Sequence, residues 1–340
     1  MAFGDGDDAE REPCLRRSAN RGDRALTFPR ILPSQPQAAR RPARLAAARG
    51  ACYASRRPRA ESAGDAGVQE GARMTATTPL PVSTAPWKPD LKIAVLLGVV
   101  SALAVAALIP YLVQLMPDKF AKLPVPLPVL VVAQSLQALV LMGLTSLAGL
   151  RMGRRVGLGA PLLQRWINHE PLVLAPRPLQ AILLGVAAAL GVVALSAGID
   201  PFLPPMLHPP AKSGAGESAL NGFLASFYGG IAEELQLRLF LMTLMVWLVA
   251  VLRKARPSPR VYGIAIAMAA LLFGVGHLPA AHHVWGLDAV VVVRTVLLNS
   301  IAGLAFGWLY WKRGLEMAIL AHFSADIVLH VLAPLVAKAA

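Results

Sequence analysis

Residues 230–242 read GIAEELQLRLFLM and decide the fold. Apolar residues extend this segment from residue 219 to residue 252, a run long enough to cross a bilayer, and Glu233, Glu234 and Arg238 lie inside it. A charged side chain at bilayer depth costs roughly 3 kcal/mol or more. Three charged residues in so short a stretch are tolerated only if they face a protein interior or a wet cavity, which makes them candidates for a functional site.

The composition of the whole chain agrees with a membrane protein. Of its 340 residues 56% are hydrophobic and only 15% are charged, and the mean hydropathy is +0.55. A soluble domain needs less apolar surface than this to build one core. The formal net charge of +14 could suggest a nucleic-acid partner, but the arginines gather in the N-terminal tail and in short loops between apolar runs. We therefore predict an all-α, polytopic transmembrane helix bundle in a lipid bilayer, with no nucleic-acid partner.

Residues 1–90 form a basic tail rich in Arg, Ala, Gly, Pro and Ser, and they include both cysteines, Cys14 and Cys52. The tail has few large apolar residues, and burying them would not offset the entropy lost on ordering the chain. We therefore expect the tail to be disordered. It contains no apolar core of a signal peptide, and its two cysteines predict neither a disulfide framework nor a cysteine metal site. Translation is hypothesised to begin at Met74, which the intact mass of the natively expressed chain would test.

Seven apolar runs have the length needed to span a membrane, for which about 20 helical residues suffice. They cover residues 92–115, 127–150, 179–199, 219–252, 261–278, 288–311 and 315–336. Seven helices are the simplest interpretation. The fourth run is longer than necessary, and a break near Gly229-Gly230 would give eight.

The loops between these runs predict an orientation. Loops after the second, fourth and sixth runs carry eleven Lys and Arg residues, whereas the alternate loops and the C-terminus carry four. Because positive loops stay in the cytoplasm, this alternation places the N-terminus in the cytoplasm and the C-terminus outside, with the protein in the cell (inner) membrane.

Two further polar groups lie in late apolar runs. FGVGH at residues 273–277 ends the fifth run, and HFSAD at residues 322–326 lies in the seventh, with His322 and Asp326 on one helix face. Such a set supports hydrolysis, because a carboxylate or imidazole can take a proton from water. Glu234 and Arg238 are spaced for an ion pair, which leaves Glu233, about 100° around the helix, for different work. Histidines and carboxylates also bind zinc, so a metal-bound water is the other source of a nucleophile.

The order Glu-Glu-x-x-x-Arg, Phe-x-x-x-His and His-x-x-x-Asp, each on its own run, resembles the CAAX protease and bacteriocin-processing (CPBP, or Abi) family of intramembrane proteases. The resemblance covers roughly residues 179–336, so it implies accessory helices over 91–178 and a catalytic core over 179–340. It implies that Glu233, assisted by His277, activates water. His322 and Asp326 would stabilise the oxyanion, or His277 and His322 would hold a divalent metal such as zinc, and Glu234 and Arg238 would orient the site.

One position departs from many relatives, which carry Asn where this chain has Asp326. An ionised Asp cannot donate a hydrogen bond to an oxyanion, so Asp326 must be protonated, orient His322 or bind a metal. The resemblance implies an endopeptidase that cleaves a membrane-associated protein or peptide. The alternatives are a non-catalytic scaffold, regulator or immunity-type accessory of the same fold, and a transporter with Glu233 or Glu234 as a proton relay.

Every polar residue also has a structural interpretation. Glu234 and Arg238 can be an ion pair between packed helices, His277 a polar group at a helix end, and His322 with Asp326 an orienting hydrogen bond. An active site is excluded only if the structural interpretation holds for the polar residues of all three segments at once. His282 and His283 follow in a short loop, where we favour solvated side chains over metal ligands.

Overall fold

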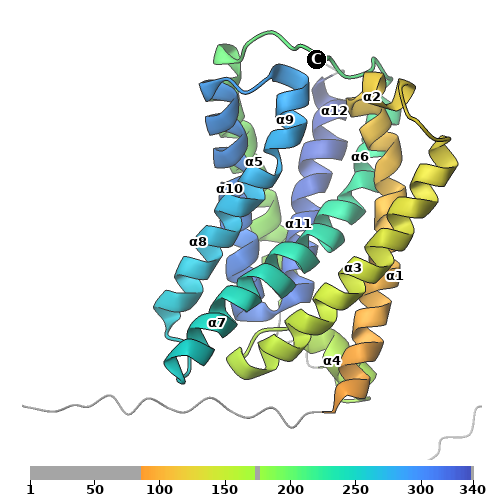
Figure 1. Ribbon diagram of the computed structural model, residues 1–340. Helices are drawn as coiled ribbons and strands as arrows, with labels where there is room; N and C mark the ends of the chain where they lie inside the picture. Colours follow the sequence, from red (N-terminus) through yellow and green to blue (C-terminus); the bar gives the residue numbers. More distant parts are fainter. Residues whose placement is uncertain (1–85, 173–176, 338–340) are drawn as a thin grey trace, which may run out of the picture. The chain divides into compact units, whose positions relative to one another are not determined.

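The computed structural model describes residues 86–172 and 177–337, which form helices joined by short loops and contain no β-strand (Figure 1). The predicted all-α bundle is therefore confirmed. The predictions for the tail, including its disorder and a start at Met74, lie outside the described residues, although the first helix begins at Trp87, slightly before the predicted end of the tail.

The described residues contain twelve α-helices, one 3₁₀-helix and three π-helical segments. Their bounds are α1 Trp87–Leu115, α2 Pro117–Ala121, α3 Leu127–Val156, α4 Pro161–Ile167, α5 Pro178–Ile199, η1 Asp200–Phe202, α6 Ala215–Phe227, η2 Tyr228–Glu233, η3 Leu235–Met242, α7 Thr243–Arg253, α8 Pro259–Gly276, α9 Leu278–Trp285, α10 Ala289–Arg313, α11 Leu315–Asp326, η4 Ile327–Leu332 and α12 Ala333–Ala337. Of these, η1 is the 3₁₀-helix, and η2, η3 and η4 are π-helical.

Seven of these helical stretches are long and apolar enough to cross a membrane, as the sequence predicts. They are Trp87–Leu115, Leu127–Val156, Pro178–Phe202, Ala215–Arg253, Pro259–Trp285, Ala289–Arg313 and Leu315–Val336. Many large apolar side chains on the outside of the bundle are exposed, among them Leu103, Leu144, Leu183 and Ile264. In a bilayer these side chains meet lipid, so their exposure to the surroundings is favourable.

The fourth span does not break at Gly229-Gly230. It runs without interruption from Ala215 to Arg253, and π-helical turns replace α-helical ones through the two glutamates. By helical rise its 39 residues extend roughly 58 Å, about twice the hydrocarbon thickness. A helix of this length must lie obliquely, and Figure 1 shows α6, η2, η3 and α7 crossing the bundle on the diagonal.

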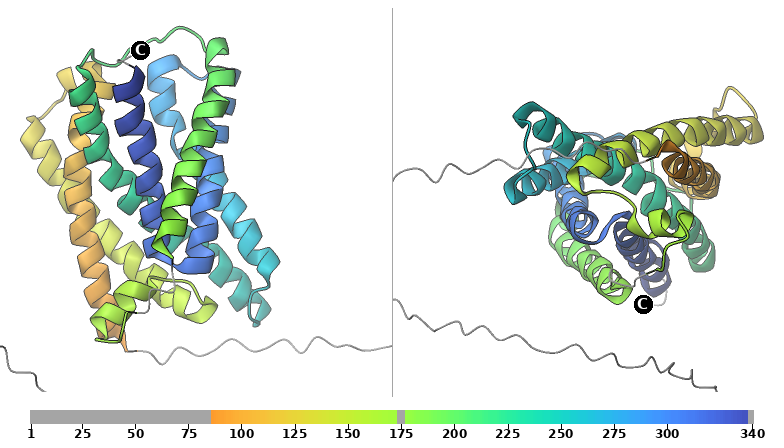
Figure 2. Two further views of the ribbon diagram at one scale, coloured as in Figure 1. Left: turned by 180° about the vertical axis from the view of Figure 1, so that it is seen from behind. Right: turned by 90° about the horizontal axis from the view of Figure 1, so that it is seen from below.

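Small residues let the helix that carries His322 pack closely. A side chain at Gly185 on α5 would collide with the backbone of Ala321 on α11, and one at Gly222 on α6 would collide with the backbone of His330. Close approach at glycine is a common way for membrane helices to associate. Figure 2 shows α5 and the α11–α12 segment side by side from behind. These contacts fix the position of α11 between α5 and the diagonal helix.

Two apolar clusters include neighbours of the polar site. One contains Leu235, Leu239 and Met242 together with residues of α1, α3, α8 and α10, and the other contains Phe306 and Ala321 with residues of α5. Glu234 and His322 are buried among these helices. Burial of this kind strengthens electrostatic interactions between the enclosed groups.

Candidate active site

The structure places five of the six predicted site residues in direct proximity. The π-helical turns η2 and η3 carry Glu233 and Arg238, Glu234 lies between these two turns, and α11 carries His322 and Asp326. His322 Nδ1 lies 2.8 Å from Glu234 Oε1. Its other ring nitrogen, Nε2, lies 3.8 Å from Glu233 Oε2 and 3.7 Å from Asp326 Oδ1. One imidazole therefore stands at the centre of three carboxyl groups.

Glu234 is fixed from two sides. Its Oε1 lies 2.8 Å from Arg238 Nη1 as an ion pair, and the side chains of Glu234 and Arg238 are 0% and 1% exposed. Arg238 Nη2 also donates a hydrogen bond to the carbonyl oxygen of Gly303 on α10, 3.2 Å away. The predicted pair between Glu234 and Arg238 is thus present. Because Glu234 is fully buried and already paired, it is suited to orient other groups.

The hydrogen bond between His322 and Glu234 assigns one proton of the imidazole. A carboxylate can only accept a hydrogen bond, so Nδ1 of His322 donates it. Nε2 is left to face Glu233 and Asp326. A charge-assisted bond of this kind fixes both the tautomer and the ring orientation, which is the usual way in which a carboxylate positions a functional histidine.

Aromatic rings hold the two histidines and the arginine in place. Phe306 stacks on His322 with centroids 4.4 Å apart, and Phe273 meets the same ring edge-on at 5.5 Å. The guanidinium of Arg238 lies 4.9 Å from the centre of Phe273 and 5.5 Å from that of Phe306. Cations over aromatic rings are stabilised by the ring quadrupole, so these phenylalanines support the arginine as well as the histidine.

His277 joins the cluster through Phe273. The two rings lie 4.8 Å apart, edge to face, and His277 Nδ1 donates to the carbonyl oxygen of Phe273 at 2.8 Å. Its Nε2 is therefore left as an acceptor in the neutral ring. The sequence places His277 near the outer end of its run, but the span continues through α9 to Trp285, so the residue lies in its interior.

The two adjacent glutamates do not serve separate partners. A regular helix separates neighbouring side chains by about 100°, from which we predicted different work for Glu233 and Glu234. Both carboxyl groups face His322, one at each ring nitrogen, and the predicted difference in their roles stays a prediction. Glu233 ends η2 and Glu234 lies between η2 and η3, so the regular helical step is interrupted on both sides of the pair. π-Helical turns of this kind are frequent at functional sites.

Gly229 belongs to the site, although its role was not foreseen from the sequence. A side chain at this position would collide with Asp326 Oδ2 and would approach His322 Nε2 to 3.2 Å. The backbone of η2 therefore lies directly against the polar face of α11. The signal in the sequence was the Gly229-Gly230 pair, which we had interpreted as a point where the helix could break.

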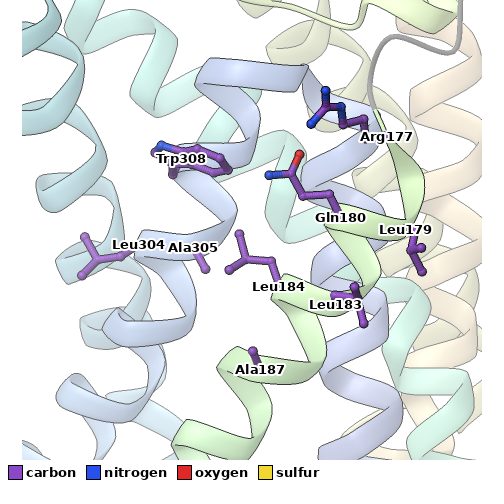
Figure 3. A pocket seen from close by; sticks show the side chains of 9 residues that line it. All are labelled: Arg177, Leu179, Gln180, Leu183, Leu184, Ala187, Leu304, Ala305 and Trp308. Atoms are coloured by element: carbon purple, nitrogen blue, oxygen red, sulfur yellow. The ribbon is translucent and has the colours of Figure 1, made fainter.

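Glu233 is the more accessible of the two glutamates, with a side chain that is 20% exposed. Its neighbours Ala232 and Gln236 line a cavity of about 470 Å³ between α1, α3 and the diagonal helix, where Gln134, Gln137 and Tyr228 add polar groups. A larger groove of about 970 Å³ lies elsewhere, between α5 and α10 (Figure 3). Leucine side chains and Trp308 line this groove. None of the predicted site residues lines either space, but the smaller cavity lies beside Glu233 along the chain, whereas the groove does not. Its apolar lining suits lipid acyl chains.

The metal pair of His277 and His322 stays a prediction. Nδ1 of His322 is bonded to Glu234 and Nδ1 of His277 to a backbone carbonyl, which orients each ring as in a metal-binding histidine and leaves its Nε2 as the candidate ligand atom. Within the described part of the chain, three potential metal ligands come close together in another region of the molecule. They are Asp118, His208 and His283, whose ligand atoms all lie within 4.8 Å of one another. The nitrogen and oxygen atoms around His322 Nε2 would still be chemically suited to a metal, but they do not form such a trio.

Comparison with known protein families identifies a match over part of the chain. Residues 215–328 match the family model described as "Type II CAAX prenyl endopeptidase Rce1-like". This match confirms the resemblance to the CPBP family of proteases over these residues, which include all six predicted site residues. The match begins at α6, so α5 lies outside it although the predicted resemblance begins at residue 179. No curated protein and no solved structure matches the chain at a significant level.

Proposed function

We propose that this multi-pass membrane protein, with its match to a CAAX-type protease family, is an endopeptidase that hydrolyses a peptide bond of a membrane-associated protein or peptide. The observation that supports the proposal is the arrangement around His322. One ring nitrogen is held by a buried glutamate, and the other faces a second, partly accessible glutamate. An arrangement with a base, an oriented imidazole and a route for water is what peptide hydrolysis requires.

Glu233 is the proposed general base. Its carboxylate takes a proton from a water molecule, and the resulting hydroxide attacks the carbonyl carbon of the scissile peptide bond. The oxyanion that forms is stabilised by a hydrogen bond from Nε2–H of protonated His322. The proton held by Glu233 then passes to the departing amine as the C–N bond breaks. His277, with its Nε2 available as an acceptor, assists in positioning the water.

In this scheme His322 carries a proton on each ring nitrogen. Glu233, Glu234 and Asp326 surround its ring, and Arg238 is the other cation of the cluster. Nδ1–H is donated to Glu234, which leaves Nε2–H to face the developing oxyanion. Asp326 then acts on His322 by charge and orientation, so its replacement of the more common Asn is compatible with activity.

The proposed substrate route is the cavity beside Ala232 and Gln236. It lies along the helix that carries Glu233, and its glutamines can hydrogen-bond to an extended peptide backbone. Under this proposal the helices of residues 91–178 form one wall of the route and the core of residues 179–340 supplies the chemistry. The N-terminus is proposed to lie in the cytoplasm, with the arginine-rich loops beside α4, α7 and α10 at the lower end in Figure 1.

Cleavage of a fluorogenic peptide library by the detergent-purified full chain tests the proposal. Glu233→Gln and His277→Ala should each reduce cleavage, Glu233→Gln by about 10²- to 10⁴-fold, the contribution of general acid–base catalysis. Glu217→Gln is the matched control, because Glu217 is exposed near the start of the same long helix. Full cleavage by Glu233→Gln would contradict the proposed base. A folded wild-type chain that cleaves no member of the library would favour a scaffold, which should also keep its cellular phenotype in Glu233→Gln.

A further inference from the structure

Three side chains from three separate segments meet at the end of the bundle opposite the arginine-rich loops. Asp118 lies on α2, His208 in the loop between η1 and α6, and His283 on α9. Their ligand atoms all lie within 4.8 Å of one another. Figure 1 shows α2 and α9 near the upper end of the bundle, away from the site on η2, η3 and α11. None of the three residues belongs to the motifs of the proposed active site.

The spacing of these atoms fits a transition-metal site. Asp118 Oδ1 lies 2.9 Å from His283 Nε2, and Asp118 Oδ2 lies 3.4 Å from His208 Nδ1. In a tetrahedral zinc site with metal–ligand distances near 2.0–2.1 Å, neighbouring ligand atoms are roughly 3.3 Å apart. The two observed separations involve different oxygens of Asp118, and each is close to the spacing of neighbouring ligand atoms around one ion. Two imidazoles and one carboxylate are also a ligand set that zinc accepts.

The segment that carries His208 is held in place by its backbone. The amides of Leu207 and His208 donate to the carbonyl oxygen of Val284 at 2.8 and 3.2 Å, and the amide of Ala211 donates to that of Gln114 at 2.8 Å. The ring of His208 stacks on that of His283 with centroids 4.6 Å apart and an angle of 2°. The three side chains are thus brought together by the fold before any ion binds. Because the His208 side chain is 50% exposed, its ring has room to turn toward a metal.

The structure also corrects a prediction about two neighbouring histidines. We expected both His282 and His283 to be solvated. His282 is exposed, as expected, but the side chain of His283 is only 9% exposed and is bonded to Asp118. The two residues therefore differ in environment although they are adjacent on α9. This difference provides a matched control for any experiment on the trio.

We propose that Asp118, His208 and His283 form a binding site for a divalent transition metal such as Zn²⁺, with water in the fourth position. A bound ion would join α2, the loop of residues 203–214 and α9 into one rigid unit. Since α9 begins directly after His277, such a unit would also restrain the corner that presents His277. The site is separate from the proposed catalytic cluster, so the inference holds whether or not the chain is a protease.

Metal content of the purified full chain tests this site. The protein, prepared without an added histidine tag, is equilibrated with ZnCl₂, passed through a desalting column and analysed for zinc per chain. We expect about one zinc in the wild type, in His282→Ala and in His322→Ala. His208→Ala and His283→Ala should lose it, and Asp118→Asn should bind zinc at least about 10-fold more weakly. Circular dichroism confirms that each variant retains its helices.

Several outcomes would overturn the proposal. A folded wild-type chain without bound zinc would do so, as would full zinc content in His208→Ala and His283→Ala, which would place the metal elsewhere. Loss of zinc in His322→Ala with retention in His208→Ala would assign it to the catalytic cluster. Thermal unfolding supplies a second readout, because zinc should raise the unfolding temperature of the wild type and of His282→Ala but not of His208→Ala. An equal rise in all three proteins would contradict the site.

Discussion

Replacement of Arg238 by leucine should destabilise the protein strongly. Arg238 forms an ion pair with the fully buried carboxylate of Glu234, which also accepts from His322, and it donates to the carbonyl oxygen of Gly303. Leucine fills part of the space but leaves the carboxylate buried without its charge partner. The residue should therefore matter for folding even before catalysis is considered.

The magnitude follows from the burial of the pair. Removal of one partner from a buried ion pair costs about 3–5 kcal/mol, because the remaining charge stays desolvated. The hydrogen bond that His322 donates to Glu234 remains, so the lower half of this range is expected. In a Glu234→Gln background the same substitution should cost at least about 2 kcal/mol less, since no charge is left uncompensated. Glutamine can still accept the hydrogen bond from Nδ1 of His322 through its amide oxygen.

Reversible unfolding in mixed micelles of the wild type, the two single variants and the double variant measures this coupling. Arg260→Leu is the control, because Arg260 is exposed near the start of α8 and its replacement should change stability by less than about 0.5 kcal/mol. Equal costs of Arg238→Leu in both backgrounds would refute the reasoning, since they would show that the arginine and the carboxylate are not coupled. A cost below about 1 kcal/mol in the wild-type background would refute it as well.

Two further predictions concern the backbone near the site and the orientation of the bundle. Gly229→Ala should reduce cleavage at least 10-fold with little loss of stability, because the new methyl group displaces the end of the Asp326 side chain. Gly230→Ala should affect stability more than cleavage, because its methyl group would press on Phe323. Kinetic and unfolding measurements on both variants test this, and equal cleavage activities of the two variants would contradict it. In a chain whose two native cysteines have been replaced, a single cysteine at Lys254 should be protected from a membrane-impermeant thiol reagent in intact cells, whereas one at Lys212 should react. The reverse pattern of labelling would contradict the proposed orientation.

The sequence was sufficient to predict the spans because lipid imposes a simple requirement on length and polarity. All seven runs are present, and the fourth remains one helix. The main error lies at the end of the fifth run, which was expected to stop at residue 278 but continues to Trp285. Leu278-Pro279 and the two following histidines resemble a loop, yet proline is well tolerated in the first turn of a helix, where its missing amide has no partner to lose.

The sequence predicted which helices carry the polar cluster but not how its members pair. Motif spacing identifies residues on one face of a helix, whereas the contacts between α11 and the diagonal helix depend on tertiary packing. The π-helical turns on either side of Glu234 break the regular step on which such predictions depend. Phe306, which stacks on His322, carries no polar signal that would single it out among the apolar residues of α10.

Burial provides a physical reason for assigning different tasks to two adjacent glutamates that share one partner. Glu234 is inaccessible, and its carboxylate is committed to Arg238 and to Nδ1 of His322, so it has no route to a water molecule or a substrate. Glu233 is 20% exposed and lies at 3.8 Å from Nε2, too far for a hydrogen bond but close enough for both groups to contact one reacting water. A base must exchange protons with its substrate, and an orienting group must not. The proposed division therefore follows from accessibility, and the adjacent positions in the sequence let one continuous helix supply both groups.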